Sequence, residues 1–132
     1  MRKFMLAVTC ATALAALTVS VPGASSAHTD VFLGTWTSTD HDGSHQQLDI
    51  RGSAPGTHAV RLYDDAASVA CQGDPAHVQG IADVDADTML VTGTLTCQPG
   101  GNPLVGRISL LFSYSPGTDT LTDDSGVTWV RS

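Results

Sequence analysis

The chain has 132 residues, a formal charge of −7 and three cysteines, and its first 27 residues have the composition of an export signal. Residues 28–132 contain thirteen Asp and four Arg but no Glu and no Lys, giving a formal charge of −9. This composition excludes a Schiff-base or phosphate-loop lysine and a glutamate-dependent zinc-protease motif from that region. It also argues against binding to nucleic acid or to an anionic membrane, because both rely on clustered Lys and Arg.

The N-terminal segment is predicted to be a cleaved secretory signal peptide. Arg2 and Lys3 precede an apolar run over residues 4–21, and Ser25-Ser26-Ala27 has the small residues of a cleavage site. We therefore expect a secreted, extracellular protein in which residues 28–132 form a single domain. A monomer with no membrane attachment after cleavage is the expected state.

Cys71 and Cys97 are the two cysteines outside the expected signal peptide. In an oxidising compartment an even pair favours a single disulfide. Its loop of about 26 residues gives a stabilisation of ~3–4 kcal/mol in the chain-entropy model. The competing thiolate metal or redox site has less support, since the chain has no Cys-x-x-Cys motif.

Hydrophobic residues in the expected domain recur with a period of two, which is typical of strands. In residues 89–97, for example, Met89, Val91 and Leu95 alternate with polar positions that are mostly threonine. Gly, Pro and Asp clusters separate such runs at short intervals. The pattern predicts eight strands near residues 31–39, 44–52, 57–64, 76–85, 89–97, 105–115, 118–123 and 126–131.

Short connections make sequential strands antiparallel neighbours, and a meander of eight strands can close on itself and so remove its exposed edges. The predicted fold is therefore an all-β, up-and-down β-barrel. A two-sheet β-sandwich is the alternative, because periodicity does not distinguish a closed sheet from two facing ones.

The first and last expected strands carry a recognisable pair of sequence motifs. Gly34-Thr35-Trp36 opens the first strand, and Trp129-Val130-Arg131 closes the last. This pairing resembles the calycin superfamily, the lipocalins and their small bacterial β-barrel relatives. The resemblance implies that Trp36 packs at the closed end of the barrel and that Arg131 lies across it, with Gly34 as the third signature residue.

The chain also resembles the secreted bacterial metalloprotease inhibitors of the small β-barrel type, which share its expected mature length, single disulfide, Gly-x-Trp opening strand and basic C-terminal strand. In that family a flexible N-terminus enters the protease cleft, and the corresponding segment here would be residues 28–30. Protease inhibition is therefore an alternative function.

Metal binding has two weak candidate sites. Asp40 and Asp42 alternate as in a calcium loop, but His45 and Arg51 occupy the positions where an EF-hand needs Gly and Glu. A polar hairpin turn explains them more simply, with Gly43 supplying a positive φ. His28 would become the N-terminal residue after cleavage, and a terminal His can chelate copper.

The sequence gives little support to catalysis. It has no Gly-x-Ser-x-Gly nucleophile motif, and its scattered Ser, His and Asp residues form no recognisable triad pattern. We expect a non-catalytic binding protein without a cofactor, for a small apolar ligand or a partner protein, and keep a small secreted hydrolase as an alternative. The irregular stretch beside Cys71 is a possible recognition loop, with candidate residues Tyr63, Asp64, Asp65, Gln72 and Asp74.

Overall fold

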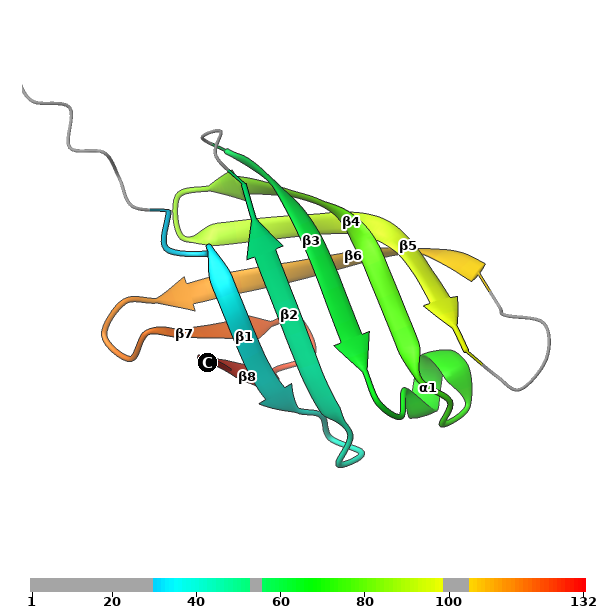
Figure 1. The fold of residues 1–132 in the computed structure, drawn as a ribbon. Helices are drawn as coiled ribbons and strands as arrows, with labels where there is room; N and C mark the ends of the chain where they lie inside the picture. Colours follow the sequence, from blue (N-terminus) through cyan, green and yellow to red (C-terminus); the bar gives the residue numbers. More distant parts are fainter. Residues whose placement is uncertain (1–29, 53–55, 99–104) are drawn as a thin grey trace, which may run out of the picture.

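The computed structural model shows a closed barrel of eight antiparallel strands and describes residues 30–52, 56–98 and 105–132. Figure 1 shows β1–β3 lying in front of β6–β8, with one helical turn between β3 and β4. The up-and-down barrel is confirmed, and the sandwich alternative is wrong. The elements are β1 (Gly34–Thr39), β2 (His45–Arg51), β3 (Thr57–Asp64), α1 (Ser68–Cys71), β4 (Ala76–Asp85), β5 (Thr88–Cys97), β6 (Val105–Ser115), β7 (Thr120–Asp123) and β8 (Thr128–Arg131).

Pairing between the first and last strands closes the barrel. β1 and β8 run antiparallel, with Trp36 opposite Arg131 and Thr37 opposite Val130. Every other strand pairs with its neighbours along the chain. Closure satisfies the backbone groups that an open sheet would expose at its edges.

The predicted period-two faces are present, and the apolar residues of alternate positions point inward. Leu48 and Ile50 of β2, and Met89 and Val91 of β5, are fully buried, while their neighbours are more exposed. Inside the barrel they join Phe32, Trp36 and Phe112 in one continuous core. The apolar residues gather inside the barrel because the strand pleat sends successive side chains to opposite faces of the sheet.

β4 and β5 approach each other closely at one pair of glycines. Gly80 lies opposite Gly93. A Cβ atom added to Gly80 would lie 2.1 Å from the Thr92 carbonyl oxygen, and one added to Gly93 would lie 2.4 Å from the Gln79 carbonyl oxygen. A side chain at either position would therefore push the two strands apart.

The strand boundaries differ from the prediction mainly at the two chain ends. Residues 31–33 form a turn and not the start of the first strand, because the Asp30 carboxylate accepts the Phe32 N–H at 3.1 Å and the Asp30 carbonyl accepts the Leu33 N–H at 3.2 Å. β7 and β8 each begin two residues later than predicted, after turns. The predicted signal peptide and His28 lie outside the described residues.

The helical turn α1 was not predicted and sits in the stretch expected to be irregular. Gln72, with a φ of 57°, ends it in the left-handed conformation. The Cys71–Cys97 disulfide is present and joins α1 to the end of β5, as predicted. In the described parts of the chain, no helix has the length and apolar character to cross a bilayer.

Candidate functional site

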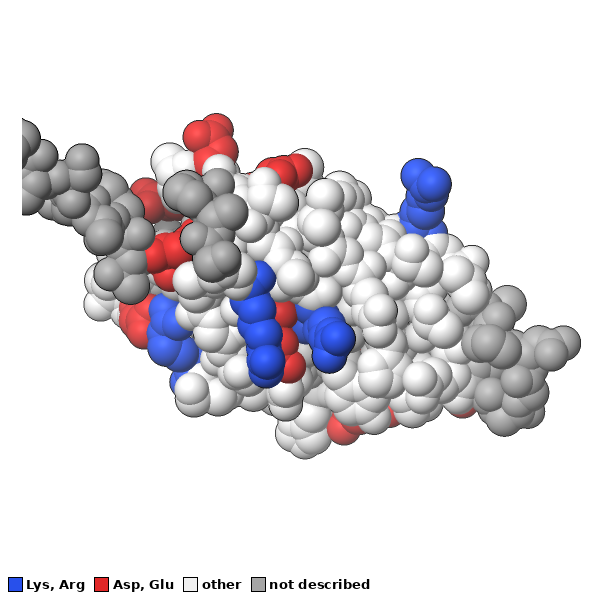
Figure 2. All heavy atoms as spheres, turned by 45° about the horizontal axis from the view of Figure 1, so that its top comes forward, with Lys and Arg blue, Asp and Glu red and all other residues white. Residues whose placement is uncertain are grey.

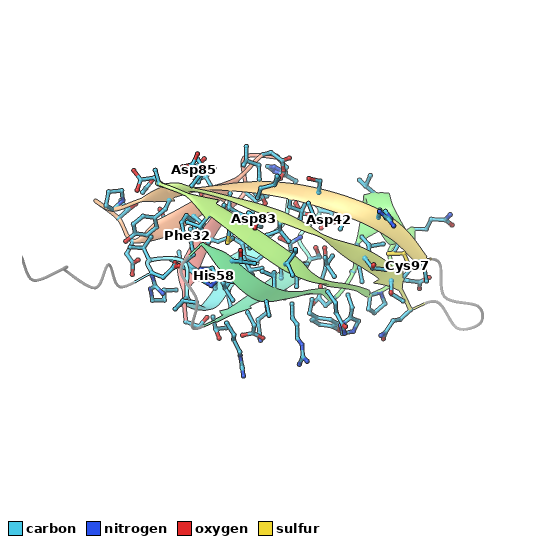
Figure 3. All side chains as sticks on the ribbon, turned by 90° about the horizontal axis from the view of Figure 1, so that it is seen from above. Phe32, Asp42, His58, Asp83, Asp85 and Cys97 are labelled. Carbon is cyan, nitrogen blue, oxygen red and sulfur yellow. A yellow bond between two sulfur atoms is a disulfide. The ribbon has the colours of Figure 1, made fainter. Side chains whose placement is uncertain are left out.

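A cavity of about 190 Å³ opens at one end of the barrel. We call this the open end; it carries the β1–β2 turn, α1 and the β7–β8 turn. The opposite closed end carries residues 30–33 and the β6–β7 turn. In Figure 3, Phe32, His58 and Asp85 lie toward the closed end and Cys97 lies at the open one. The inner wall of the cavity is apolar and includes Leu62, Val78, Ile108, Leu110, Phe112 and Trp129.

Two aromatic rings in this wall are held in fixed positions. Phe112 and Trp129 meet edge to face with ring centroids 5.8 Å apart. The Trp129 indole N–H donates to Asp123 Oδ2 at 3.0 Å, so the indole keeps a hydrogen bond inside the apolar wall. Asp123 Oδ1 also accepts the N–H groups of Ser125 and Val127, each at 3.0 Å. Asp123 therefore fixes both the β7–β8 turn and the ring behind it.

Acidic side chains stand at the mouth of the cavity. Asp40, Asp64, Asp123 and Asp124 all line it, and no Lys or Arg does so among the described residues. The Gln46 side-chain amide bridges two of these acids, donating to Asp64 Oδ2 at 2.9 Å and to Asp40 Oδ2 at 3.3 Å. The arrangement gives a small apolar interior with a negatively charged entrance.

The helical turn α1 borders the mouth and is fixed by two links. The disulfide joins Cys71 to β5, and the Ser68 N–H donates to Asp42 Oδ2 at 3.2 Å, which ties α1 to the β1–β2 turn. Hydrogen bonds, first from the Ser68 hydroxyl and then from the Ser44 backbone, hold the pKa of Asp42 well below its usual range. Asp42 thus stays ionised while it links the two segments.

The chain matches no protein-family model, no curated protein and no solved structure. Its architecture is a closed eight-stranded antiparallel barrel that is compatible with the calycin fold.

The predicted recognition loop does not form one surface. Asp64 is the last residue of β3 and is buried beside the cavity, whereas Tyr63 points outward and packs against His77, with ring centroids 4.7 Å apart and ring planes tilted by 47°. Asp65 is exposed and accepts the His45 N–H at 2.8 Å. Gln72 and Asp74 lie in the turn after α1. Of these five residues, the structure places only Asp64 in the cavity wall.

The proposed closing residues meet at the closed end. The Arg131 guanidinium lies over the Trp36 ring, 4.0 Å from its centroid, and donates to the carbonyl oxygens of Leu33 at 2.7 Å and Val31 at 2.8 Å. Gly34 has a φ of 126°, and a Cβ atom there would lie 3.1 Å from Arg131 Nη1. Glycine is suited to this position because it tolerates that φ and leaves room for the arginine.

The predicted metal ligands have other partners where they are described. Asp40 accepts from the His41 N–H and from Gln46, and Asp42 accepts from Ser44 and Ser68, so both act in the hairpin turn. Gly43 has a φ of 90°, as the hairpin interpretation requires. Residues 30–52, 56–98 and 105–132 contain no group of three His, Cys or Asp side chains placed to hold a metal ion. A copper site at His28 stays a prediction.

Part of the N-terminal segment named in the inhibitor hypothesis belongs to the closed end. The Asp30 carboxylate contacts His58 Nε2, and the carbonyl oxygens of Val31 and Leu33 accept hydrogen bonds from the Arg131 guanidinium. His28 and Thr29 lie outside the described residues. Protease inhibition by this segment remains a prediction.

The outer wall of the barrel offers a second, less distinctive surface. Hollows over β2–β5 are lined mostly by polar side chains such as Gln47, Tyr63 and Gln79. Figure 2 shows arginine side chains gathered near acidic ones on one part of this face, and another arginine projecting alone from the largely uncharged remainder. This surface lacks the combination of apolar interior and charged entrance found in the cavity.

Sequence reasoning missed Gln46 and Trp129 as cavity residues. Gln46 belongs to the inward row of β2 with Leu48 and Ile50, so its period-two position could have shown it as a polar residue facing the interior. Trp129 is buried in the core, but the empty space beside it depends on which side chains meet across the barrel.

Proposed function

We propose that this chain is a calycin-like, exported, non-catalytic binding protein that holds a small and mainly apolar ligand in its open-end cavity. The observation that carries the proposal is the apolar inner wall formed by residues such as Phe112 and Trp129 around about 190 Å³ of space. Among the described residues, the core fills the closed half of the barrel and the cavity lies in the open half.

The size of the cavity limits the ligand. Apolar cavities of about 150 Å³ admit benzene, and drug-sized pockets begin at about 300 Å³. A cavity of about 190 Å³ is therefore suited to one aromatic ring or a short alkyl chain, and is too small for a long lipid. The disulfide and the barrel keep the wall in place, which lowers the entropic cost of ordering it on binding.

Calorimetric titration with 2-phenylethanol, a neutral single-ring probe, tests the proposal. We expect saturable one-to-one binding to the wild-type protein. Leu110→Phe enlarges a side chain in the cavity wall and is expected to weaken binding at least tenfold. Leu111→Phe is the matched control, since Leu111 is the next residue of β6 and is exposed on the outer face.

Two results would contradict the proposal. The first is a wild-type protein that binds neither 2-phenylethanol nor another single-ring probe of similar size. The second is an equal loss of binding in Leu110→Phe and Leu111→Phe, which would place the probe outside the cavity. Thermal unfolding of each variant establishes that it is folded before it is titrated.

A further inference from the structure

We infer that the cavity selects ligands that carry a protonated amine, with the apolar part inside the barrel and the ammonium group at the mouth between Asp40 and Asp64. This inference rests on the proposed function and adds the chemical class of the ligand. It follows from the charge, burial and hydrogen bonding of the side chains at the mouth.

Asp64 is a buried carboxylate without a cationic partner. Its residue is 5% exposed, and its hydrogen bonds come from two neutral donors, the Gln46 amide at 2.9 Å and the Ala66 N–H at 3.0 Å. Within the described residues, the ion pairs are His58–Asp30 and Arg131–Asp119, both at the closed end. An ionised carboxylate is costly to bury unless an opposite charge accompanies it, and a ligand cation would supply that charge.

Gln46 holds Asp40 and Asp64 on the same side of the mouth. The Ser38 hydroxyl donates to Gln46 Oε1 at 2.8 Å, so the amide nitrogen faces the two acids. Each carboxylate has sites for about four hydrogen bonds, and the bonds described above use two at each acid. Both acids therefore retain acceptor capacity toward the cavity that they line.

The other acids at the mouth act through their charge. The Asp123 carboxylate already accepts hydrogen bonds from Ser125, Val127 and Trp129, so it has little acceptor capacity left for a ligand. Together with exposed Asp124 it still adds negative charge at the entrance, where no described Lys or Arg opposes it. A low-dielectric cleft lined by one sign of charge concentrates the field and attracts ligands of the opposite sign.

Three probes of one size and three charges test the inference: 2-phenylethylamine as the cation, 2-phenylethanol as the neutral probe and phenylacetate as the anion. Titrated into the wild-type protein at neutral pH, the amine is expected to bind at least tenfold more tightly than the alcohol. Phenylacetate is expected to bind more weakly than either.

Asp64→Asn separates charge recognition from cavity binding. The substitution keeps the shape of the side chain and removes its charge, so the amine is expected to lose at least tenfold more affinity than the alcohol loses. Asp40→Asn is expected to act in the same direction with a smaller effect, because Asp40 is more exposed. Asp85→Asn is the matched control, since Asp85 is exposed at the far end of β4 (Figure 3).

The outcomes distinguish this inference from the proposed function. Equal affinity of the wild-type protein for the amine and the alcohol would overturn amine selection and leave the cavity as a neutral binding site. Failure of all three probes to bind would overturn the proposed function itself. An equal effect of Asp64→Asn and Asp85→Asn would show that the preference arises from overall charge and would also overturn the site.

Discussion

Arg131 of β8 lies over the Trp36 ring of β1, with its guanidinium carbon 4.0 Å from the ring centroid. The same guanidinium donates to Asp119 through Nε at 2.9 Å and Nη2 at 3.0 Å, and to two carbonyl groups of the N-terminal turn. One side chain thus links the first strand, the last strand, the β6–β7 turn and residues 31–33. A cation held over an aromatic ring while it donates several hydrogen bonds in fixed directions requires the guanidinium fork, which Lys cannot provide.

We expect Arg131→Gln to destabilise the fold by about 1–2 kcal/mol, since it removes the cation–π contact and shortens the side chain that links these segments. Urea unfolding measures the change. Arg107→Gln is the control, because Arg107 is an exposed arginine of β6 away from the closed end. Equal stability of the two variants would show that Arg131 does not close the barrel.

Trp36→Ala is expected to cost about 3–5 kcal/mol, because the indole is fully buried and its loss leaves a large cavity in the core. The indole N–H also donates to the Phe32 carbonyl at 2.9 Å, so the N-terminal turn loses an anchor. Trp36→Phe keeps a ring and is expected to cost less. Unfolding followed by circular dichroism gives both values, and a near-neutral Trp36→Ala would contradict the closing role.

The closed end should respond to acid through Asp119. Hydrogen bonds from Arg131 hold the pKa of Asp119 below its ordinary value of 3.8. An acid with a lowered pKa in the folded state adds stability above its unfolded pKa and loses it as the pH falls through the folded value. We expect Asp119→Asn to unfold at lower urea than wild type at pH 6, with the difference shrinking below about pH 3. A constant difference across this range would contradict the linkage.

Ionisation of the Tyr114 hydroxyl should lower the stability of the fold at alkaline pH. Burial, with a hydrogen bond to Asp119 at 3.1 Å, raises the pKa of the Tyr114 hydroxyl above its ordinary value of 10.0. A raised pKa adds stability that is complete below the unfolded pKa and is lost as the pH rises through the folded one. Tyr114→Phe is therefore expected to lessen the loss of stability above pH 10, as measured by urea unfolding at a series of alkaline pH values.

Replacing both Cys71 and Cys97 by Ser is expected to destabilise the protein by ~3–4 kcal/mol, the value for releasing a loop of about 26 residues in the chain-entropy model. Because the bond also holds α1 at the mouth, we expect weaker binding of 2-phenylethanol in the same variant. Intact mass before and after reduction of the exported protein checks the bond and cleavage after Ala27 together. Unchanged stability in the double variant would contradict a structural role for the disulfide.

Gly93→Ala is expected to destabilise the barrel by about 1–3 kcal/mol, because the added methyl group would meet the Gln79 carbonyl oxygen at 2.4 Å. Gly106→Ala in β6 is the matched control, since a Cβ atom there has no neighbour within 4 Å. Thermal unfolding compares the two. If both variants unfold at the same temperature, the close approach of β4 and β5 is not required.

The sequence by itself determined most of the strands and their buried faces, and it favoured a barrel while leaving the β-sandwich open, because closure of the sheet depends on the pairing of β1 with β8. Alternation in runs such as Met89–Cys97 specifies which faces are buried, because the period of a strand is two. Short turns then leave antiparallel neighbours as the simplest arrangement, and three of the eight strand ranges (57–64, 76–85 and 105–115) match the structure at both ends. The oxidising context suggested by the leader pointed to Cys71–Cys97, which the structure contains.

Only the tertiary structure decided where a ligand can bind. Asp64 and Tyr63 are adjacent in the sequence and were assigned to one loop, yet the strand pleat sends Asp64 to the cavity and Tyr63 to the outer wall. Asp40, Gln46 and Asp64 come from three segments, and barrel closure brings them together at the mouth. Unfilled space depends on how all the inward side chains pack together, so no local pattern in the sequence reports it.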